Sequence, residues 1–436
     1  MAEGARGLII AGPATGQGKT TLTLGLVAAL RARGMKVGAL KVGPDYIDPG
    51  YHLAAGAAGS FNLDHWGMRP ATRAALIAQL GTGAEILLGE GMMGLFDGVP
   101  GGGGSTADIA AETGWRVILA IDAGPQAQSV AAVAQGFARF RKDVNVAGVV
   151  LTKVGGPPHR KLLAEALAAV GIRVFGMIGY HSTLSLPERH LGLVQARERK
   201  LDRLIENLAE AVTAGVDVDA LLAAATPARI TAHDVARPLP PLGQRIAIAD
   251  DAAFAFAYPH ILAGWRAAGA EVTQFSPLDD EGPPRDCDAV YLPGGYPELH
   301  AGRLAINANF RLGMYAAAVR GAAIYGECGG YMALGDALID AKGASHAMLG
   351  LLPVTTSFAQ PALHIGYRTV ALAAETPLGP AGARFRGHAF HFSSATSEAD
   401  TERLFAVTDA DGSALAPAGL RRGTVCGSYL HLIDAA

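Results

Sequence analysis

The feature that most constrains the fold is an apolar run that leads through a glycine-bearing loop directly into a helical pattern. The run LIIAG is followed by PATGQGKTTLTLGLVAAL, so a buried strand, a loop and a helix follow one another without a gap. In such a loop backbone N–H groups hold phosphate oxygens, Lys19 reaches the β- and γ-phosphates, and the Thr20 hydroxyl can hold Mg²⁺. The spacing is a variant one, because five residues separate Gly12 from Gly18 and Pro13 stands where the first glycine would fall.

A glycine-rich turn that opens an ordinary helix is the alternative to a phosphate loop. Strand, loop, Lys-Thr pair and helix coincide here, which favours nucleotide binding. The predicted ATP-binding residues are Gly12, Thr15, Gly16, Gln17, Gly18, Lys19, Thr20 and Thr21.

Apolar runs with glycine-rich ends alternate through the first half with alanine- and leucine-rich stretches at helical spacing. The runs predict buried strands at residues 7–12, 37–43, 84–91, 116–122, 146–154 and 173–179. The stretches between several of them predict helices at residues 20–33, 71–80, 126–139 and 159–170. This alternation predicts an α/β domain with a doubly wound parallel sheet and helices on both faces.

The periodicity lapses in the proline-rich stretch 226–244, TPARITAHDVARPLPPLGQ. We predict a phosphate-loop domain over residues 1–235, a linker over 236–244 and a second α/β domain over 245–436. In the second domain the pattern predicts strands at 245–250, 271–275, 289–293 and 322–325, and helices at 258–268 and 303–319. From residue 354 onward, β-branched and aromatic runs with short gaps predict antiparallel strands.

Composition limits which binding partners and which cellular location we expect for the protein. With 50% hydrophobic and 17% charged residues in 436, the chain has enough apolar material for packed cores. A formal net charge of -3 provides no broad basic field, so we expect small-molecule substrates and no nucleic acid partner. No apolar run of about 18 residues and no signal-peptide pattern occurs, so we expect a cytoplasmic protein that does not enter a membrane. Three widely spaced cysteines argue against a disulfide framework or a zinc site.

Two acidic segments follow predicted strands of the first domain. LKVGPDYIDPGYH contains Lys41, Asp45 and Asp48, and LLGEGMMGLFDG contains Glu90 and Asp97. Strand carboxyl ends of a doubly wound sheet meet at the ligand site, so these carboxylates are expected around the γ-phosphate. There they can bind Mg²⁺ or position a nucleophile, and the lysine can neutralise an anionic substrate. For any single member, a turn-forming or capping role is an equal alternative.

A cysteine of the second domain stands between a predicted strand and a predicted helix. In AAIYGECGGYMALG, Cys328 has Gly326 and Gly330 two residues to either side, the pattern of a nucleophile elbow. We expect the helix N-terminus to lower the pKa of this thiol, and His431 in GSYLHL to act as its base. A small buried core thiol is the alternative interpretation.

Another glycine pair precedes this elbow. YLPGGYPELHA ends a predicted strand in Gly294 and Gly295, whose backbone N–H groups could form an oxyanion hole for a thioester intermediate. Cys287 and Cys426 lack such surroundings and are expected to be structural.

Seven segments together resemble the cobyrinate and hydrogenobyrinate a,c-diamide synthases of cobalamin biosynthesis. They occur in that family's order and span nearly the whole chain: GQGKTTLTLGL, KVGPDYIDPGYH, EGMMGLFDG, LPERHLGLVQA, LPGGYPELHA, GECGGYMALG and GSYLHL. The first domain is similar to dethiobiotin synthetase. The second is similar to the flavodoxin-like class I glutamine amidotransferases.

The resemblance implies an ATP- and glutamine-dependent ligase that amidates the a and c carboxylates of a corrinoid through acyl phosphates. Cys328 and His431 would be the catalytic residues that release ammonia from glutamine. The resemblance places Mg²⁺ at Thr20, Asp45 and Glu90. It places the substrate and acyl phosphate at Lys41, Asp45, Tyr46, Asp48, Asp97 and His190. It leaves the oligomeric state open, a homodimer included.

One position departs from the wider amidotransferase pattern. The acidic residue expected two positions after the histidine is Ile433, so another group must orient His431. The segment LPERHLGLVQA looks closer to the metal-free hydrogenobyrinate branch, with cobyrinate as the alternative substrate. Two other hypotheses about function stay open. One is a dethiobiotin-synthetase-like carboxylase with an inert second domain, and the other is a partition-ATPase-type nucleotide switch.

Overall fold

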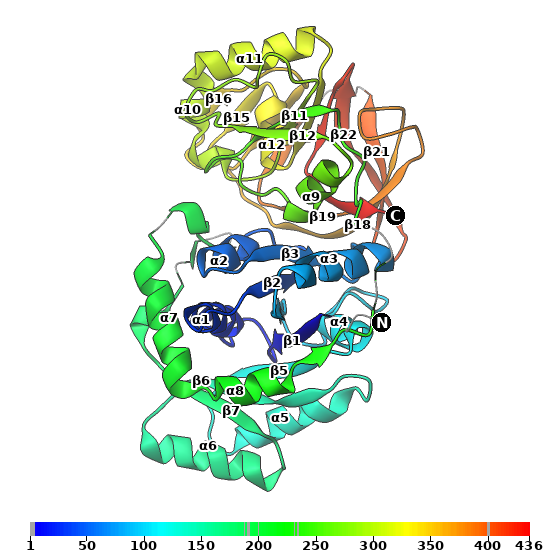
Figure 1. Cartoon of the computed structure of the whole chain (residues 1–436). Helices are drawn as coiled ribbons and strands as arrows, with labels where there is room; N and C mark the ends of the chain where they lie inside the picture. Colours follow the sequence, from blue (N-terminus) through cyan, green and yellow to red (C-terminus); the bar gives the residue numbers. More distant parts are fainter. Residues whose placement is uncertain are drawn as a thin grey trace. The chain divides into compact units, whose positions relative to one another are not determined.

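The computed structural model describes residues 5–186, 188–189, 192–198, 200–230, 232, 235–398 and 402–436. The chain divides into two compact units (Figure 1). The first comprises Met1–Trp66 and Pro70–Val235, and the second comprises Gly67–Arg69 and Ala236–Ala436. The short segment Gly67–Arg69 belongs to the second unit because Arg69 forms an ion pair with the buried Asp434, with Nη2 and Oδ1 2.7 Å apart.

The first unit is built on a sheet of eight strands, seven of which run parallel in the order β3-β2-β4-β1-β5-β6-β7. Their bounds are β1 Arg6–Ala11, β2 Val37–Val42, β3 Gly59–Leu63, β4 Ile86–Glu90, β5 Arg116–Asp122, β6 Val146–Val154 and β7 Val174–Gly179. The eighth, β10 (Thr226–Pro227), pairs antiparallel with β1. A separate two-stranded sheet joins β8 (Glu188–Arg189) to β9 (Gly192–Leu193). The predicted doubly wound parallel sheet is confirmed.

Helices of this unit follow the strands along the chain. They are α1 Lys19–Ala32, α2 Asp48–Ala54, α3 Pro70–Thr82, α4 Thr106–Thr113, α5 Ser129–Phe140, α6 Pro157–Ala169, α7 Asp202–Gly215 and α8 Val218–Ala224, with 3-10 turns η1 Ser182–Leu184 and η2 Ala196–Glu198. Helix α4 begins at a capping box, in which Ser105 and Asp108 each bond the other's backbone N–H. Helix α1 begins directly after Gly18, whose φ of 85° ends the loop.

The second unit contains a ten-stranded sheet in the order β12-β11-β13-β14-β23-β22-β21-β18-β19-β24. The first five strands in this order are parallel, and the remaining pairings are antiparallel. Their bounds are β11 Arg245–Ala249, β12 Glu271–Phe275, β13 Ala289–Leu292, β14 Ala323–Glu327, β18 His364–Leu372, β19 Arg384–His391, β21 Arg403–Asp409, β22 Ala414–Arg422, β23 Val425–Ser428 and β24 Leu430–Ala435. The predicted antiparallel addition after residue 354 is confirmed.

A smaller sheet and five helical segments complete the second unit. The sheet has the order β16-β15-β17-β20, with β15 Ala337–Ile339, β16 Ser345–Ala347, β17 Val354–Ser357 and β20 Ser394–Glu398. The helical segments are α9 Pro259–Ala267, η3 Pro297–Leu299, α10 Ala301–Ile306, α11 Ala308–Val319 and α12 Gly329–Leu334. No helix among the described residues is both long and apolar enough to cross a membrane.

The single helix predicted over residues 303–319 is wrong, because the chain breaks between α10 and α11. Asn307 has a ψ of 97°, outside the helical range. Its buried side-chain amide donates to the carbonyl oxygens of Pro277 and Leu278 at 2.7 and 3.2 Å. These bonds hold Asn307 out of the helical conformation, and helical periodicity in the sequence cannot reveal them.

The segment 236–244 contains no helix or strand and is packed into the second unit. Ala236, Leu239 and Leu242 are buried. The indole Nε1 of Trp265 donates to the carbonyl oxygen of Pro240 at 3.0 Å. This proline-rich segment therefore packs against the rest of the second unit.

Candidate functional site

The phosphate loop between β1 and α1 is shaped by two glycines and closed by a lysine. Gly16 and Gly18 have φ values of 81° and 85°, in the left-handed region that favours glycine. The Nζ of Lys19 donates to the carbonyl oxygens of Ala14 and Met93 at 2.8 and 2.7 Å. Burial, followed by the charge of Lys41, lowers the pKa of Lys19 to about 8. A phosphate at this loop would favour the charged form of Lys19.

Hydrogen bonds to neighbouring strands hold the loop in place. Gln17 Oε1 accepts from the N–H of Asp122 at 2.9 Å, and its carbonyl oxygen accepts from the Thr152 hydroxyl at 3.0 Å. The carbonyl oxygen of Gly12 accepts from the N–H of Leu95 at 2.8 Å. Gly12 and Gln17 thus fix the loop. The other predicted ATP-binding residues, Thr15, Gly16, Gly18, Lys19, Thr20 and Thr21, line a pocket.

A buried ionic network adjoins the loop at the end of β4. Glu90 Oε1 accepts from the Thr20 hydroxyl at 2.6 Å and from Lys41 Nζ at 3.0 Å, while Oε2 lies 2.8 Å from His52 Nε2. Lys41 also forms an ion pair with Asp48. These side chains come from α1, α2, β2 and β4, so the parallel sheet and its following helices bring them together.

The charges of this network shift one another's pKa values. Burial alone would lower the pKa of Lys41, but Asp48 and Glu90 outweigh it and raise this pKa above its usual value. Burial opposes the ionisation of Glu90, yet Lys41 and His52 together lower its pKa. Burial and then the charge of Asp45 raise the pKa of Asp48. Lys41 and Glu90 therefore form a stable charged pair beside the loop.

The remaining predicted substrate residues take different places. Asp45 Oδ1 accepts from the backbone N–H groups two and three residues further along the chain, and its side chain lines the pocket. Tyr46 is buried. Asp97 Oδ2 accepts from a backbone N–H three residues before it, and Asp97 is not among the residues that line the pocket. His190 lies outside the described residues.

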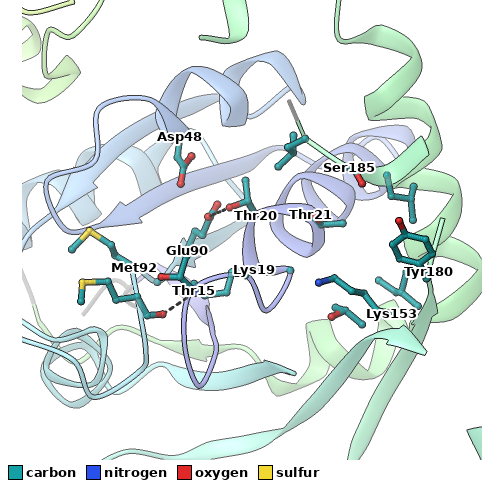
Figure 2. Close-up of a pocket in the computed structure, with 18 of the residues that line it drawn as sticks. Thr15, Lys19, Thr20, Thr21, Asp48, Glu90, Met92, Lys153, Tyr180 and Ser185 are labelled. Atoms are coloured by element: carbon teal, nitrogen blue, oxygen red, sulfur yellow. Dashed lines mark hydrogen bonds between the residues drawn. The ribbon is translucent and has the colours of Figure 1, made fainter. Parts of the chain in front are cut away.

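The pocket at the loop has a volume of about 580 Å³. Figure 2 shows Asp48 and Glu90 on one side of it and Lys153 and Tyr180 on the other, with Thr20 between them. His52, Lys153 and Tyr180 were not predicted from the sequence. Lys153 lies at the end of predicted strand 146–154 and Tyr180 directly after strand 173–179, so the strand-end rule that selected Glu90 could have found them.

Thr20 and Glu90 fit a magnesium ion that is bound together with nucleotide phosphates. A hydroxyl and a carboxylate 2.6 Å apart beside a phosphate loop are hard oxygen donors, and phosphates and waters supply the other ligands of such an ion. Within the described parts of the chain, no group of three or more His, Cys, Asp or Glu side chains could hold a metal. The donor set therefore suits Mg²⁺ bound with ATP better than an all-protein metal site.

Cys328 occupies a strained turn between β14 and α12. Its φ and ψ are 46° and −104°, in a region that residues with a side chain rarely adopt. Its N–H donates to the carbonyl oxygen of Ser428 at 2.8 Å. A Cβ added at Gly330 would lie 1.9 Å from the carbonyl oxygen of Leu292, and one at Gly326 would lie 2.8 Å from the carbonyl carbon of Gly330. The glycines therefore permit the close packing that holds the turn.

The histidine and the glycine pair converge on the same place. A Cβ added at Gly294 would lie 2.4 Å from His431 Cε1, 3.0 Å from its Nε2 and 3.2 Å from Cys328 Cβ. A Cβ added at Gly329 would lie 2.9 Å from the backbone nitrogen of Gly295. The backbone of the glycine pair therefore lies against His431 and the turn that carries Cys328, an arrangement compatible with acyl transfer to a thiol.

The thiol and the imidazole of this site both favour their neutral forms. Burial, followed by the charge of Glu298, raises the pKa of Cys328. Burial, followed by the charges of His388 and His391, lowers the pKa of His431 to about 3. The expectation that the helix N-terminus lowers the thiol pKa is therefore wrong for the ligand-free site, because burial of the thiol and a nearby carboxylate outweigh the six-residue α12. The raised pKa of the thiol and the lowered pKa of the imidazole both favour the neutral forms.

Glu327, which the sequence analysis did not select, lies beside this site. It precedes Cys328 in the chain and is buried, and its Oε2 is 3.8 Å from His431 Nδ1. Ile433, at the position of the expected acid, is buried. Cys287 and Cys426 are also buried, and burial raises the pKa of both.

Comparison with known proteins assigns a family to each half of the chain and to the whole. Residues 8–194 match the CobQ/CobB/MinD/ParA nucleotide binding domain, and residues 245–436 match the CobB/CobQ-like glutamine amidotransferase domain. Among solved structures, PurLQS from Thermotoga maritima covers 43% of this chain and 86% of its own, at 18% identity and a TM-score of 0.31.

Curated relatives match over nearly their full length. A hydrogenobyrinate a,c-diamide synthase from Brucella suis is 51% identical over 98% of this chain and 98% of its own. That from Rhizobium meliloti is 52% identical over 98% and 99%, and that from Mesorhizobium japonicum is 48% identical over 99% of both chains. The chain therefore belongs to the hydrogenobyrinate a,c-diamide synthase family.

Proposed function

We propose that this protein converts the a and c carboxylates of hydrogenobyrinate to amides, with ATP as the energy source and glutamine as the nitrogen donor. The observation that carries this proposal is the presence in one chain of a phosphate loop with an adjoining Thr20–Glu90–Lys41 network and of a strained Cys328 beside His431 and Gly294. A nucleotide switch or a carboxylase would need only the first of these.

The thiol site supports release of ammonia from glutamine. Cys328 Sγ bonds to the side-chain carbonyl carbon of glutamine, and the thiol proton passes to His431. His431 then returns this proton to the departing nitrogen, so the C–N bond breaks and ammonia leaves a thioester. Water cleaves the thioester to give glutamate and the free thiol. The backbone N–H of Gly295, which lies against Gly329, is suited to stabilise the oxyanion that forms in both steps.

The phosphate-loop site supports activation of a carboxylate. An oxygen of the substrate carboxylate bonds to the γ-phosphorus of ATP as the bond to the ADP oxygen breaks. Ammonia then attacks the acyl carbon, and phosphate leaves with the C–O bonding electrons and the proton is lost to solvent. Lys19 and Lys41 stabilise the charges on the transferred phosphoryl group and on the substrate carboxylate.

Thr20 and Glu90 would hold the magnesium ion, which offsets phosphate charge when bound. Glu90 already carries its negative charge in the structure because Lys41 and His52 lower its pKa. His52 also bonds the Ser60 hydroxyl at 3.0 Å, which fixes the ring against Glu90. His52 is therefore suited to keep the Glu90 carboxylate oriented toward the loop.

The names of the curated relatives support the metal-free macrocycle as the substrate. The test is an assay with ATP, Mg²⁺ and glutamine against hydrogenobyrinate and cobyrinate separately, with product mass read by mass spectrometry. We expect successive losses of 1 Da, two in all, from hydrogenobyrinate, and ADP formed in step with them. Failure to amidate either macrocycle, or product formed from bicarbonate without glutamine, would contradict the proposal.

A further inference from the structure

The acid that ordinarily follows the catalytic histidine by two positions is replaced by Ile433, and a carboxylate from another strand lies beside the same ring. Glu327 is the last residue of β14, and His431 lies on β24. Oε2 of Glu327 is 3.8 Å from Nδ1 of His431, and both side chains are fully buried. This distance is within ion-pair range and longer than a hydrogen bond, so Glu327 would act on the ring through its charge.

Three donors hold the Glu327 carboxylate in place. Oε2 accepts from the Tyr291 hydroxyl at 2.7 Å. Oε1 accepts from the Tyr325 hydroxyl and from the backbone N–H of Leu432, both at 3.0 Å. The two tyrosines pair across β13 and β14 and their rings stack, with centroids 5.9 Å apart. Burying a carboxyl group without hydrogen-bond donors would be costly. The three donors, which come from three strands, therefore stabilise Glu327 at this buried position.

The position of this carboxylate gives it a part in the reaction. Attack by Cys328 sends the thiol proton to His431, which makes the ring positive in a buried place. We propose that Glu327 is the positioning residue for His431, orienting the ring and stabilising its charged form in place of the acid missing at position 433. This inference rests on the proposed glutaminase chemistry and adds to it the group that supports the base.

The charged groups that act on the pKa of His431 do not supply this negative charge, and the charge of Glu298 acts on Cys328. His388 and His391 on β19 face the ring with neutral or positive charge, and burial lowers the pKa of each to about 4. Tyr258, which precedes α9, packs its ring edge-on to His431 at 6.3 Å. Burial raises the pKa of Glu327 to about 7, against the hydrogen bonds of the tyrosines, which lower it. Glu327 therefore gains its charge as the pH rises through neutrality.

The test compares Glu327→Gln with the unaltered enzyme in the full-length chain. The amide keeps the shape of the side chain and removes its charge. We expect glutamine-dependent amidation to fall on the order of 100-fold, less than the about 10⁴-fold that follows loss of an acid hydrogen-bonded to a catalytic histidine, because Glu327 acts on the ring from 3.8 Å through its charge. Ammonia-dependent amidation should be unchanged. A second readout is the rate of Cys328 inactivation by 6-diazo-5-oxo-L-norleucine against pH. In the unaltered enzyme the inactivation rate should rise near pH 7, and in Glu327→Gln this rise should be absent.

Two further variants, Tyr325→Phe and a control, test the role of Glu327 if Glu327→Gln folds poorly. Tyr325→Phe removes one donor to the carboxylate, so the pKa of Glu327 should rise and the step should move to higher pH. Glu398→Gln removes a carboxylate that accepts from the Tyr331 hydroxyl on α12, and it should leave the step in place. The inference is overturned if the inactivation rate of Tyr325→Phe rises at the same pH as that of the unaltered enzyme. It is also overturned if Glu327→Gln is inactivated more slowly at every pH but keeps the rise near pH 7.

The proposed function can fail separately from this inference. Glutamine-dependent turnover in Cys328→Ala would overturn the glutaminase chemistry itself. Full glutamine-dependent turnover in Glu327→Gln, with none in Cys328→Ala, would overturn only the role of Glu327.

Discussion

The two candidate sites of this chain differ in how they hold charge. The phosphate-loop site contains a preformed ion pair between Lys41 and Glu90. The thiol site contains a neutral cysteine and a neutral histidine, because burial raises the pKa of Cys328 and lowers that of His431 to about 3. Lys41 and Glu90 favour their charged forms before ligands arrive, whereas Cys328 and His431 favour their neutral forms until the reaction begins.

This difference follows from the ligands proposed for each site. ATP and a substrate carboxylate bring negative charge, so the site that receives them has cationic groups already oriented, and little reorganisation is needed on binding. Glutamine presents a neutral amide to the thiol. A thiolate kept permanently in a buried site would need a partner charge and would be open to oxidation. The neutral resting state therefore suits a glutaminase that turns over slowly until the other site is occupied.

The largest effect is expected from Lys19→Ala. The variant loses the cation proposed to contact the phosphates, so amidation should fall on the order of 1000-fold with glutamine and with ammonium alike. Lys161→Ala, which removes an exposed lysine from α6, is the matched control. Steady-state ADP release measures both. Undiminished ammonia-dependent turnover in Lys19→Ala would show that the loop does not serve phosphoryl transfer.

An effect restricted to the other site is expected from Gly294→Ala. The added methyl group would lie 2.4 Å from His431 Cε1 and 3.2 Å from Cys328 Cβ. The ring must move, so glutamine-dependent amidation should fall about 100-fold while ammonia-dependent amidation persists. Gly302→Ala in α10 is the control for a methyl group added in the same unit, because the nearest atom to that group is His346 Cε1 at 3.6 Å. Equal rates of glutamine-dependent amidation by Gly294→Ala and Gly302→Ala would contradict the proposal that the thiol site supplies the ammonia.

The smallest effect concerns the resting thiol. Because its pKa is raised, little thiolate exists at pH 8, and iodoacetamide should alkylate Cys328 at least about 10-fold more slowly than free cysteine. Peptide mass spectrometry separates Cys328 from the buried Cys287 and Cys426. Labelling that is fast and independent of pH down to pH 6 would mean that the thiolate is preformed, and the contrast in charge would be lost.

Most of the fold could be predicted from the sequence because buried parallel strands are continuous apolar runs. All six strands predicted in the first half are present, whereas β3 was missed because GSFNL is short and interrupted by polar residues. Helix α2 was missed because its sequence, DPGYHLA, contains proline and glycine and lacks helical periodicity. The break at Asn307 depends on carbonyl groups almost 30 residues away in the chain, at Pro277 and Leu278, which no local pattern encodes.

The sites could be predicted where a local motif marks them. Lys19 directly follows a loop shaped by Gly16 and Gly18, and Cys328 stands between Gly326 and Gly330, so both glycine patterns are visible in the sequence. Glu327 and His52 were not predicted because their roles depend on contacts across strands, to His431 and to Glu90 respectively. The direction of the Cys328 pKa was predicted wrongly because burial, which outweighs the helix N-terminus, is a property of the folded chain.

The most direct test of the division of labour between the two sites is Cys328→Ala, assayed with glutamine and with ammonium at saturating ATP. Cys426→Ala, which alters another buried cysteine on the adjacent β23, is the matched control and should keep both activities. The account predicts no detectable amidation from glutamine by Cys328→Ala and ammonium-driven amidation within about twofold of the unaltered enzyme. Loss of both activities in a folded Cys328→Ala variant, or retention of glutamine use, would contradict it.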